Sequence, residues 1–340
     1  GEFYLKSILV KFIWVKILVI TIFQEEVMVK LYLAVPCYNE EEVLYDTTEK
    51  LTKKYDQMIN DGLITSDSKI YYIDDGSKDK TWTIIDELHN KNKYVNGIKM
   101  SRNRGHQNAL LGGLMTIKDD CDCVISIDAD LQDDINTFDE MIKDFENGSE
   151  IVYGVRSKRA TDTAFKRMTA QGFYKVLSML GAEVVYNHAD FRLMSKRALN
   201  ALAEFKEVNL FLRGLVPLVG FKSSVVEYER SERLAGESKY PLKKMLGLAW
   251  DGVTSLSMKP IRMITSLGAI VFCISLIMLI YSFIMWIIGN TVSGWSSLIV
   301  SIWALGGLQL LAIGVVGEYI GKIYMESKHR PRFIVEEQLK

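Results

Sequence analysis

Two carboxylates one residue apart, Asp128 and Asp130, are the strongest chemical feature of this 340-residue sequence. They follow the apolar run 123–127, which has the pattern of a buried strand. Carboxylates that leave a buried strand repel each other and lose solvation, so they need a counter-charge. A divalent cation, Mg²⁺ or Mn²⁺, would supply that charge and bridge to a diphosphate. The alternative is a solvated acidic loop, which the buried run disfavours.

Further polar strings follow other predicted strands. They are Tyr38-Asn39-Glu40, Asp74-Asp75 and Ser101-Arg102-Asn103. In a parallel sheet, ligands bind beyond the carboxyl ends of the strands. Together with the Asp128–Asp130 pair, these strings therefore predict one shared site.

Strands and helices alternate at short spacing in the first half of the chain. Strands are expected at 30–35, 69–73, 97–100, 123–127 and 151–155, and helices at 40–55, 81–89, 108–117 and 134–145. This alternation predicts an α/β fold, a mainly parallel sheet covered by helices on both faces. Amphipathic stretches follow at 165–180 and 241–256. The second could be a core-packed helix, but its position just ahead of apolar segments favours an interfacial helix.

Residues 263–317 contain no Asp, Glu, Lys or Arg. Within this stretch and just beyond it, the segments 264–288 and 298–320 are each long enough to cross a bilayer as a helix. Cations flank both outer ends, at Lys259, Arg262, Lys322, Lys328, Arg330 and Arg332. The positive-inside rule then predicts a multi-pass membrane protein with both ends of the hairpin in the cytoplasm. Spans without charge argue against a proton relay or an ion path.

Composition narrows the possible partners. The net charge of −1 and the lack of a long basic run argue against nucleic acid. The four cysteines form neither a disulfide framework nor a zinc pattern, which favours a reducing cytoplasmic setting.

Gly314, Gly317 and Gly321 permit close helix packing, within the hairpin or between copies, and favour a homo-oligomer.

The first 27 residues do not fit the rest of the pattern. They are apolar but carry Lys6, Lys11 and Lys16, so no uninterrupted run approaches the ~20 residues of a spanning helix. No small-residue cleavage site follows, which argues against a signal peptide. We expect residues 1–27 to be a non-native or extension segment and the working protein to begin near Met28; an interfacial anchor helix is the alternative.

The strings at the strand ends resemble the motifs of glycosyltransferase family 2. They are Val35-Pro36-Cys37-Tyr38-Asn39-Glu40-Glu41, Asp74-Asp75-Gly76-Ser77, Ser101-Arg102-Asn103 with Gly105-His106-Gln107-Asn108, and Asp128-Ala129-Asp130-Leu131-Gln132-Asp133. The strings 190–194, 236–241 and 317–321 are similar to those of the polyprenyl-phosphate (bactoprenol) glycosyltransferase branch, which is related to dolichol-phosphate mannose synthase. The resemblance covers the chain from Met28 onward.

The resemblance implies an A-type glycosyltransferase fold, which is Rossmann-like, and inversion at the anomeric carbon. The donor would be a UDP-sugar, of glucose or N-acetylglucosamine, and the acceptor undecaprenyl phosphate. Carried over by position, the residues for the nucleotide-sugar are Pro36, Tyr38, Asn39, Glu40, Asp75, Ser101 and Asp128. Asp128, Asp130 and Gln132 would hold the Mg²⁺ or Mn²⁺ ion, and Asp130 would be catalytic. For Asp75 a turn-forming role is the alternative.

The acceptor phosphate is assigned four cations: Arg156, Arg167, Arg233 and Lys239. Guanidinium forks suit phosphate oxygens, although any of these cations could instead face anionic lipid. Asp190 is a candidate catalytic base, but a phosphate monoester, with a second pKa of about 6, is already mostly dianionic at neutral pH. Asp190 is therefore a base, a residue that orients Arg192 or the acceptor, or a structural hydrogen-bonding residue. His106 is either a phosphate or sugar contact or an ordinary loop histidine.

These expectations divide the chain into five parts: 1–27, a cytoplasmic catalytic domain 28–239, an interfacial helix 240–260, two transmembrane helices 261–322 and a basic cytoplasmic tail 323–340. The expected function is sugar transfer at the cytoplasmic face of the cell membrane, giving a lipid-linked sugar for modification of cell-envelope glycans. A processive polysaccharide synthase would need more spans. A lipid flippase or a non-catalytic scaffold would not need the metal and nucleotide strings.

Overall fold

The structure, a computed structural model, describes residues 28–157, 188–208, 210–229, 254, 257, 259–289 and 294–340. Its described strands form one sheet in the order β7-β5-β6-β4-β1-β2-β3-β8. They are β1 (Leu31–Cys37), β2 (Lys69–Asp74), β3 (Val95–Met100), β4 (Cys123–Ser126), β5 (Ile151–Arg156), β6 (His188–Ser195), β7 (Ser223–Tyr228) and β8 (Val335–Leu339). The helices around the sheet are α2 (Leu44–Asn60), α3 (Thr81–Lys91), α4 (His106–Ile117), η1 (Ile135–Thr137), α5 (Phe138–Glu146), α7 (Lys196–Ala203) and α8 (Leu212–Leu218).

The sheet is mainly parallel, as predicted. β1 pairs in parallel with β2 and β4, β2 with β3, and β5 with β7, whereas β6 and β8 run antiparallel to their neighbours. Every strand and helix expected before residue 156 is present, with ends shifted by a few residues. The largest shift is at the end of α2, which reaches Asn60 rather than residue 55. This helix begins at Leu44 rather than Glu40 because the Val43 N–H closes a turn on the Glu40 carbonyl.

Alternate side chains of β1 enter two different cores. Leu31, Leu33 and Val35 pack with residues of α2, α3 and α5, whereas Tyr32 and Ala34 pack with residues of α4, α7 and α8. This burial on both faces is typical of a parallel strand in the middle of an α/β sheet. Each fully buried leucine contributes about 1.5–3 kcal/mol to the free energy of unfolding. The two helix layers therefore hold the strand ends, and the loops that follow them, in fixed positions.

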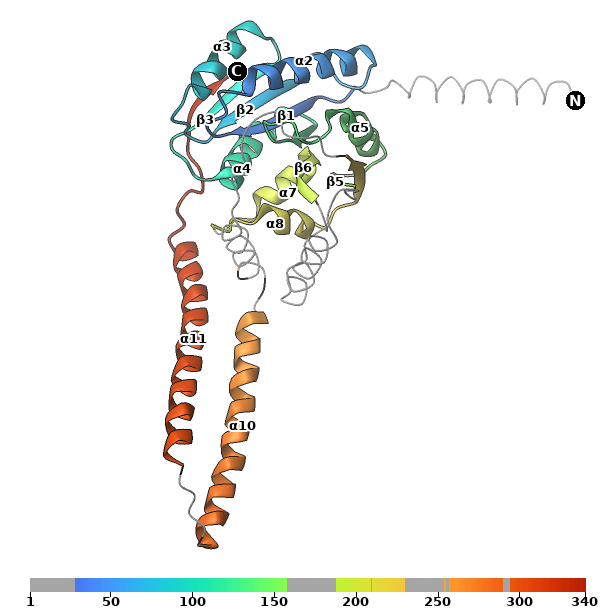
Figure 1. Cartoon of the computed structure of the whole chain (residues 1–340). Coiled ribbons are helices and arrows are strands. Elements are labelled where there is room, and N and C mark those ends of the chain that lie inside the picture. The colour runs from blue at the N-terminus through green and yellow to red at the C-terminus, as the bar shows by residue number, and fades with distance from the viewer. Residues whose placement is uncertain are drawn as a thin grey trace, which may run out of the picture.

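Two long apolar helices, α10 (Lys259–Ile287) and α11 (Trp295–Ser327), extend away from the sheet side by side (Figure 1). The segments Lys259–Met285 and Ala304–Ser327 are long and apolar enough to cross a membrane. Large apolar side chains are exposed along them; Leu310, for example, is 72% exposed. Such a continuous exposed apolar surface is typical of a membrane or protein contact. These helices coincide with the two predicted spans.

The chain returns from the hairpin to the sheet. After α11, β8 pairs antiparallel with β3 as the edge strand. Nη1 of Arg332 also donates to the Phe205 carbonyl at 2.9 Å. Part of the segment 323–340, expected to be a basic tail, is thus a strand of the catalytic sheet. Both ends of the hairpin attach to the same domain.

Among the described atoms, no packing within the hairpin explains the glycines of α11. A Cβ built on Gly314, Gly317 or Gly321 meets no described atom within 4 Å. A homo-oligomer contact at these glycines stays a prediction. The segments 1–27 and 165–180, and nearly all of 241–256, lie outside the described residues.

Candidate active site

The loops after β1 and β2 are joined by hydrogen bonds. Asn39 has a φ of 54°, a left-handed conformation that Asn tolerates better than most residues. Its N–H donates to Ser77 Oγ at 3.0 Å, and its Oδ1 accepts from the Lys78 N–H at 2.9 Å. The Glu40 N–H donates to Thr81 Oγ1 at 2.9 Å. The structure thus joins two of the predicted donor-binding strings into one fixed pair of loops.

Other predicted donor residues lie at the same edge of the sheet. Pro36 is buried in β1, and Tyr38, just after that strand, is 40% exposed. Ser101 follows β3 and is exposed, and its N–H donates to the Ile334 carbonyl at 2.9 Å. This edge therefore offers an aromatic ring and a hydroxyl to a ligand.

Asp75, just after β2, is only 2% exposed. Its Oδ1 and Oδ2 accept from the N–H groups of Arg104 and Gly105 at 2.7 and 2.8 Å. Burial raises the pKa of this carboxyl, and the two N–H donors oppose that rise. At Gly76, which has a φ of 67°, a Cβ would lie 2.7 Å from the Asn103 nitrogen. Asp75 therefore fastens the loop before α4 onto the β2 loop, and its oxygens retain lone pairs for a ligand.

The predicted metal-binding pair sits in a tight turn after β4. Leu131 has a φ of 44°, which is strained for a residue with a branched side chain. Its N–H donates to the Asp128 carbonyl at 3.2 Å. From α2, Thr47 Oγ1 supports the turn by donating to the Ala129 carbonyl at 2.6 Å. Strain of this kind costs about 1–3 kcal/mol and is typical of functional sites, where the surrounding structure maintains it.

The oxygen atoms of this turn fit a hard divalent cation. Nearly half of the Asp128 side chain, 46%, is open to water although protein atoms surround it. Burial raises the pKa of its carboxyl, His106 opposes the rise, and the nearby carboxylates, Asp190 first, add to it. Gln132 is buried beside the pair, with its N–H 3.4 Å from Asp130 Oδ1. Within the described ranges no group of three or more His, Cys, Asp or Glu is arranged to hold a metal ion by itself, so an ion at this turn would need diphosphate and water oxygens as well.

Asp190, on β6, is the centre of a charged cluster. Its Oδ1 accepts from Arg192 Nη2 and its Oδ2 from Arg213 Nη2, both at 3.1 Å. His106 Nε2 lies 3.4 Å from Asp190 Oδ2 and 3.8 Å from Asp128 Oδ1. Asp190 and Arg192 are buried, whereas the Arg213 and His106 side chains are 36% and 38% exposed. The Asp190 cluster thus links β6, α8 and α4 beside the predicted metal turn.

The charge state of Asp190 bears on its role. Burial opposes its ionisation, but the His106 hydrogen bond and the two arginines hold its pKa well below the ordinary value. Such a carboxylate is a poor proton acceptor, which favours the orienting role over the general base. For His106, burial favours the neutral form, yet the hydrogen bond to Asp190 and the charge of Asp128 raise its pKa overall.

Arg156, at the end of β5, is held in a fixed position. Its Nη2 lies 3.3 Å from Asp133 Oδ1, and its Nε donates to the Tyr228 hydroxyl at 3.1 Å. The Tyr228 hydroxyl in turn donates to Asp133. About a quarter of the Arg156 side chain, 27%, is exposed. The other predicted acceptor cations lie outside the described residues: Arg167, Arg233 and Lys239.

Sequence reasoning did not single out Arg213 and left the role of His106 open. Arg213 is the one cation in the apolar run 210–219. A lone cation in such a run is either a solvated surface residue or one with a fixed partner. The sequence could have indicated Arg213 as a candidate, but it could not identify the partner. That partner, Asp190, is 23 residues away and on another element.

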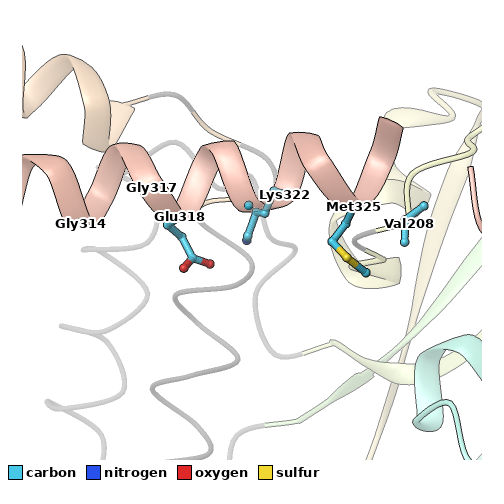
Figure 2. Close-up of a pocket in the computed structure, with 7 residues that line it drawn as sticks. Val208, Gly314, Gly317, Glu318, Lys322 and Met325 are labelled. Atoms are coloured by element: carbon cyan, nitrogen blue, oxygen red, sulfur yellow. The ribbon is translucent and has the colours of Figure 1, made fainter. Parts of the chain in front are cut away.

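A separate cavity lies against α11. Its volume is about 560 Å³, and the described residues that line it are Val208, Gly314, Gly317, Glu318, Gly321, Lys322 and Met325 (Figure 2). Lys322 Nζ also donates to Thr254 Oγ1. No predicted site residue in the described ranges lines this cavity. It is therefore distinct from the site at the strand ends.

Comparison with known proteins agrees with this geometry. Residues 32–203 match the family described as glycosyl transferase family 2. An uncharacterized glycosyltransferase of Bacillus subtilis strain 168, YkoT, is 54% identical over 91% of this chain and 92% of its own. The bactoprenol glucosyl transferase of Shigella phage SfV is 40% identical, over 91% of this chain and 99% of its own. The prophage bactoprenol glucosyl transferase homolog of Escherichia coli K12 is 38% identical, over 90% and 98%.

The solved structures are less similar to this chain than the relatives above. The glucosyl-3-phosphoglycerate synthase of Mycobacterium tuberculosis covers 67% of this chain and 77% of its own, with 15% identity and a TM-score of 0.43. The family match and the relatives identify the fold, a mainly parallel sheet with a site at its strand ends, as the A-type glycosyltransferase fold. The chain belongs to glycosyltransferase family 2.

Proposed function

We propose that this chain transfers a sugar from a UDP-sugar to undecaprenyl phosphate, with inversion, at the cytoplasmic face of the membrane. The observation that carries the proposal is the similarity to bactoprenol glucosyl transferases at about 40% identity. That similarity covers about nine tenths of the chain, so it includes the hairpin as well as the catalytic domain. Glucose and N-acetylglucosamine are the sugars proposed.

The acceptor needs orientation rather than activation. A phosphate oxygen attacks C1 of the sugar, the bond from C1 to the diphosphate oxygen breaks, and UDP leaves. Because the second pKa of a phosphate monoester is about 6, no proton has to be removed at neutral pH. This agrees with Asp190, whose low pKa suits a group that positions His106 and Arg213. Positioning of this kind lowers the barrier by removing rotational and translational freedom before the reaction.

The donor is assigned to the edge formed by the loops after β1, β2, β3 and β4. Asp75 and Asn39 have oxygen atoms suited to the nucleotide base and ribose, and Tyr38 offers an exposed ring. Pro36, Glu40 and Ser101 complete this edge. Asp128, Asp130 and Gln132 would hold Mg²⁺ or Mn²⁺, which when bound neutralises the diphosphate. The strained turn at Leu131 and the crowded Asp128 carboxyl support this assignment.

We assign the acceptor to the membrane side of the domain and its phosphate to Arg156, Arg167, Arg233 and Lys239, of which only Arg156 belongs to the described residues. Both ends of the hairpin attach to the catalytic domain, and β8 pairs with β3. This connection supports a catalytic domain and a C-terminus on the same side of the membrane. The cations at both hairpin ends favour the cytoplasmic side.

The test is a transfer assay with purified full-length protein in detergent. Undecaprenyl phosphate is combined with UDP-glucose, UDP-N-acetylglucosamine, UDP-galactose and GDP-mannose, each with Mg²⁺, with Mn²⁺ and with excess EDTA. We expect a sugar-phosphate-polyprenol product from a UDP-sugar, dependent on the metal, and an anomeric configuration opposite to that of the donor. Absence of any lipid-linked product across the panel would contradict the proposed function.

A further inference from the structure

The helix α8 is anchored beside the start of α4. The Leu212 N–H donates to Gln107 Oε1 at 2.8 Å, next in sequence to His106. Leu212 and Leu215 are buried in the same core as α4 and α7. Arg213 therefore projects from a fixed helix, and its position relative to His106 is set by the fold rather than by a surface loop.

The Asp190 cluster carries more positive than negative charge. The two guanidinium groups of Arg192 and Arg213 both face the single carboxylate of Asp190. The other close carboxylate, Asp128, is 3.8 Å from His106 and is assigned to the metal. Excess charge in a partly desolvated site is costly unless a counter-ion is present. The cluster thus has the composition of an anion site.

The two arginines differ in access. The side chain of Arg192 is 1% exposed, so it serves to balance Asp190 inside the sheet. The side chain of Arg213 is 36% exposed. Its Nε and Nη2 face Asp190, and Nη1 makes no hydrogen bond to any residue in the described ranges. Arg213 can therefore hold Asp190 with one edge of its guanidinium and an anion with the other.

We propose that Arg213 is a substrate-contacting residue that binds the phosphate monoester of the lipid acceptor, and that Asp190 holds it in place. This inference rests on the proposed function. The acceptor is favoured over the donor because the donor diphosphate is assigned to the metal at Asp128 and Asp130. A dianionic acceptor approaching that diphosphate also needs its own cation. Arg213 stands beside Asp190 rather than on the donor loops of β1 and β2.

The experiment compares Arg213→Gln and Arg213→Lys with the control Arg197→Gln. Arg197 also pairs with a carboxylate, Glu150 at 3.2 Å, but its side chain is 70% exposed on α7, outside the Asp190 cluster. UDP-sugar binding is measured by calorimetry without acceptor, and steady-state kinetics are measured with varied undecaprenyl phosphate. For Arg213→Gln we expect kcat/KM for the acceptor to fall at least about 30-fold, or about 2 kcal/mol, with UDP-sugar affinity changed less than about 3-fold.

Arg213→Lys keeps the positive charge but lacks the forked guanidinium group. Its kcat/KM for the acceptor should therefore lie between the values of Arg213→Gln and the wild type. Inorganic phosphate should inhibit the wild type more strongly than Arg213→Gln, and the Arg197 variant should match the wild type. If Arg213→Gln did not fold, a lysine variant with unchanged acceptor kinetics would overturn the inference. Equal losses for donor and acceptor, or no loss, would also overturn it. Absence of transfer by the wild type would instead contradict the proposed function.

Discussion

The two sides of the candidate site are built in different ways. On the side to which we assign the donor, called the donor side, the loops after β1 and β2 are fixed mainly by bonds to backbone N–H groups, as at Asn39 and Asp75. On the side to which we assign the acceptor, called the acceptor side, Asp190, Arg192, Arg213 and His106 are fixed by charge pairs between side chains. The donor side therefore depends on backbone geometry, whereas the acceptor side depends on charge balance. Substitutions and pH should affect the two sides differently.

The largest effect is expected at the boundary between the two sides, in the metal turn. Asp130→Asn keeps the shape of the side chain but removes charge that the diphosphate complex needs. Turnover should fall by at least ~10³-fold, about 4 kcal/mol, while the melting temperature stays unchanged. Asp46→Asn, which alters an exposed carboxylate paired with Lys50, is the control and should be neutral. Wild-type turnover in Asp130→Asn would contradict the assignment of Asp130 as a metal ligand.

The second prediction compares the two buried carboxylates directly. Asp190→Asn leaves Arg192, which is fully buried, without its counter-charge. Breaking a buried pair in this way costs about 3–5 kcal/mol of unfolding free energy. Asp75→Asn should cost less, about 1–3 kcal/mol, because an amide oxygen can still accept one of the two N–H bonds. Thermal unfolding of the two purified variants measures both losses of unfolding free energy. Equal losses in Asp190→Asn and Asp75→Asn would contradict the contrast between the two sides.

The third prediction tests the backbone of the donor side. In Gly76→Ala, the new Cβ would lie 2.7 Å from the Asn103 nitrogen, a backbone atom that cannot move aside, at a φ of 67°. We expect the UDP-sugar Kd to rise about 10-fold, since misplacement of the β2 loop loses roughly 1.4 kcal/mol of binding. Gly148→Ala is the matched control, because its φ is 86° but the nearest atom is Lys222 Nζ at 3.8 Å. If Gly76→Ala bound the donor as tightly as Gly148→Ala, the position of the β2 loop would not control donor binding.

The smallest effect is a pH dependence of the acceptor side. The pKa of His106 is raised, so its attraction to Asp190 is fully present below the ordinary value of about 6.5 and is lost as pH rises through the raised value. We expect kcat/KM for the acceptor to fall a few-fold, about 2- to 5-fold, on the alkaline side, with UDP-sugar affinity unchanged. The acceptor phosphate itself titrates near pH 6, below the pH range in which kcat/KM is expected to fall. In His106→Asn this alkaline fall should disappear. If the fall persisted in this variant, a group other than His106 would be its cause.

Much of the fold was accessible from local sequence pattern. Helices such as α2 bury a periodic set of side chains, and the central strands β1 and β4 are short, continuously buried runs, so hydrophobic pattern and turn residues predict both without knowledge of their neighbours. The two spans are set by length and lack of charge, which are also local properties. The donor-side strings follow from the same logic, because parallel strands bring their carboxyl ends to one edge of the sheet. The sequence alone thus determined the architecture, and the metal and donor roles of its strand-end residues stay predictions.

Only the tertiary structure decided the acceptor side and the end of the chain. β8 is a short edge strand beyond a membrane hairpin, and its pairing with β3 joins residues more than 200 positions apart. Asp190 and His106 are 84 residues apart, and Arg213 reaches Asp190 from a third element. Contacts of this kind leave no periodic trace in the sequence, because a charged residue looks the same whether its partner is water or a buried carboxylate. The burial of Asp190 and its surrounding cations, not its residue type, support the orienting role that we propose for it.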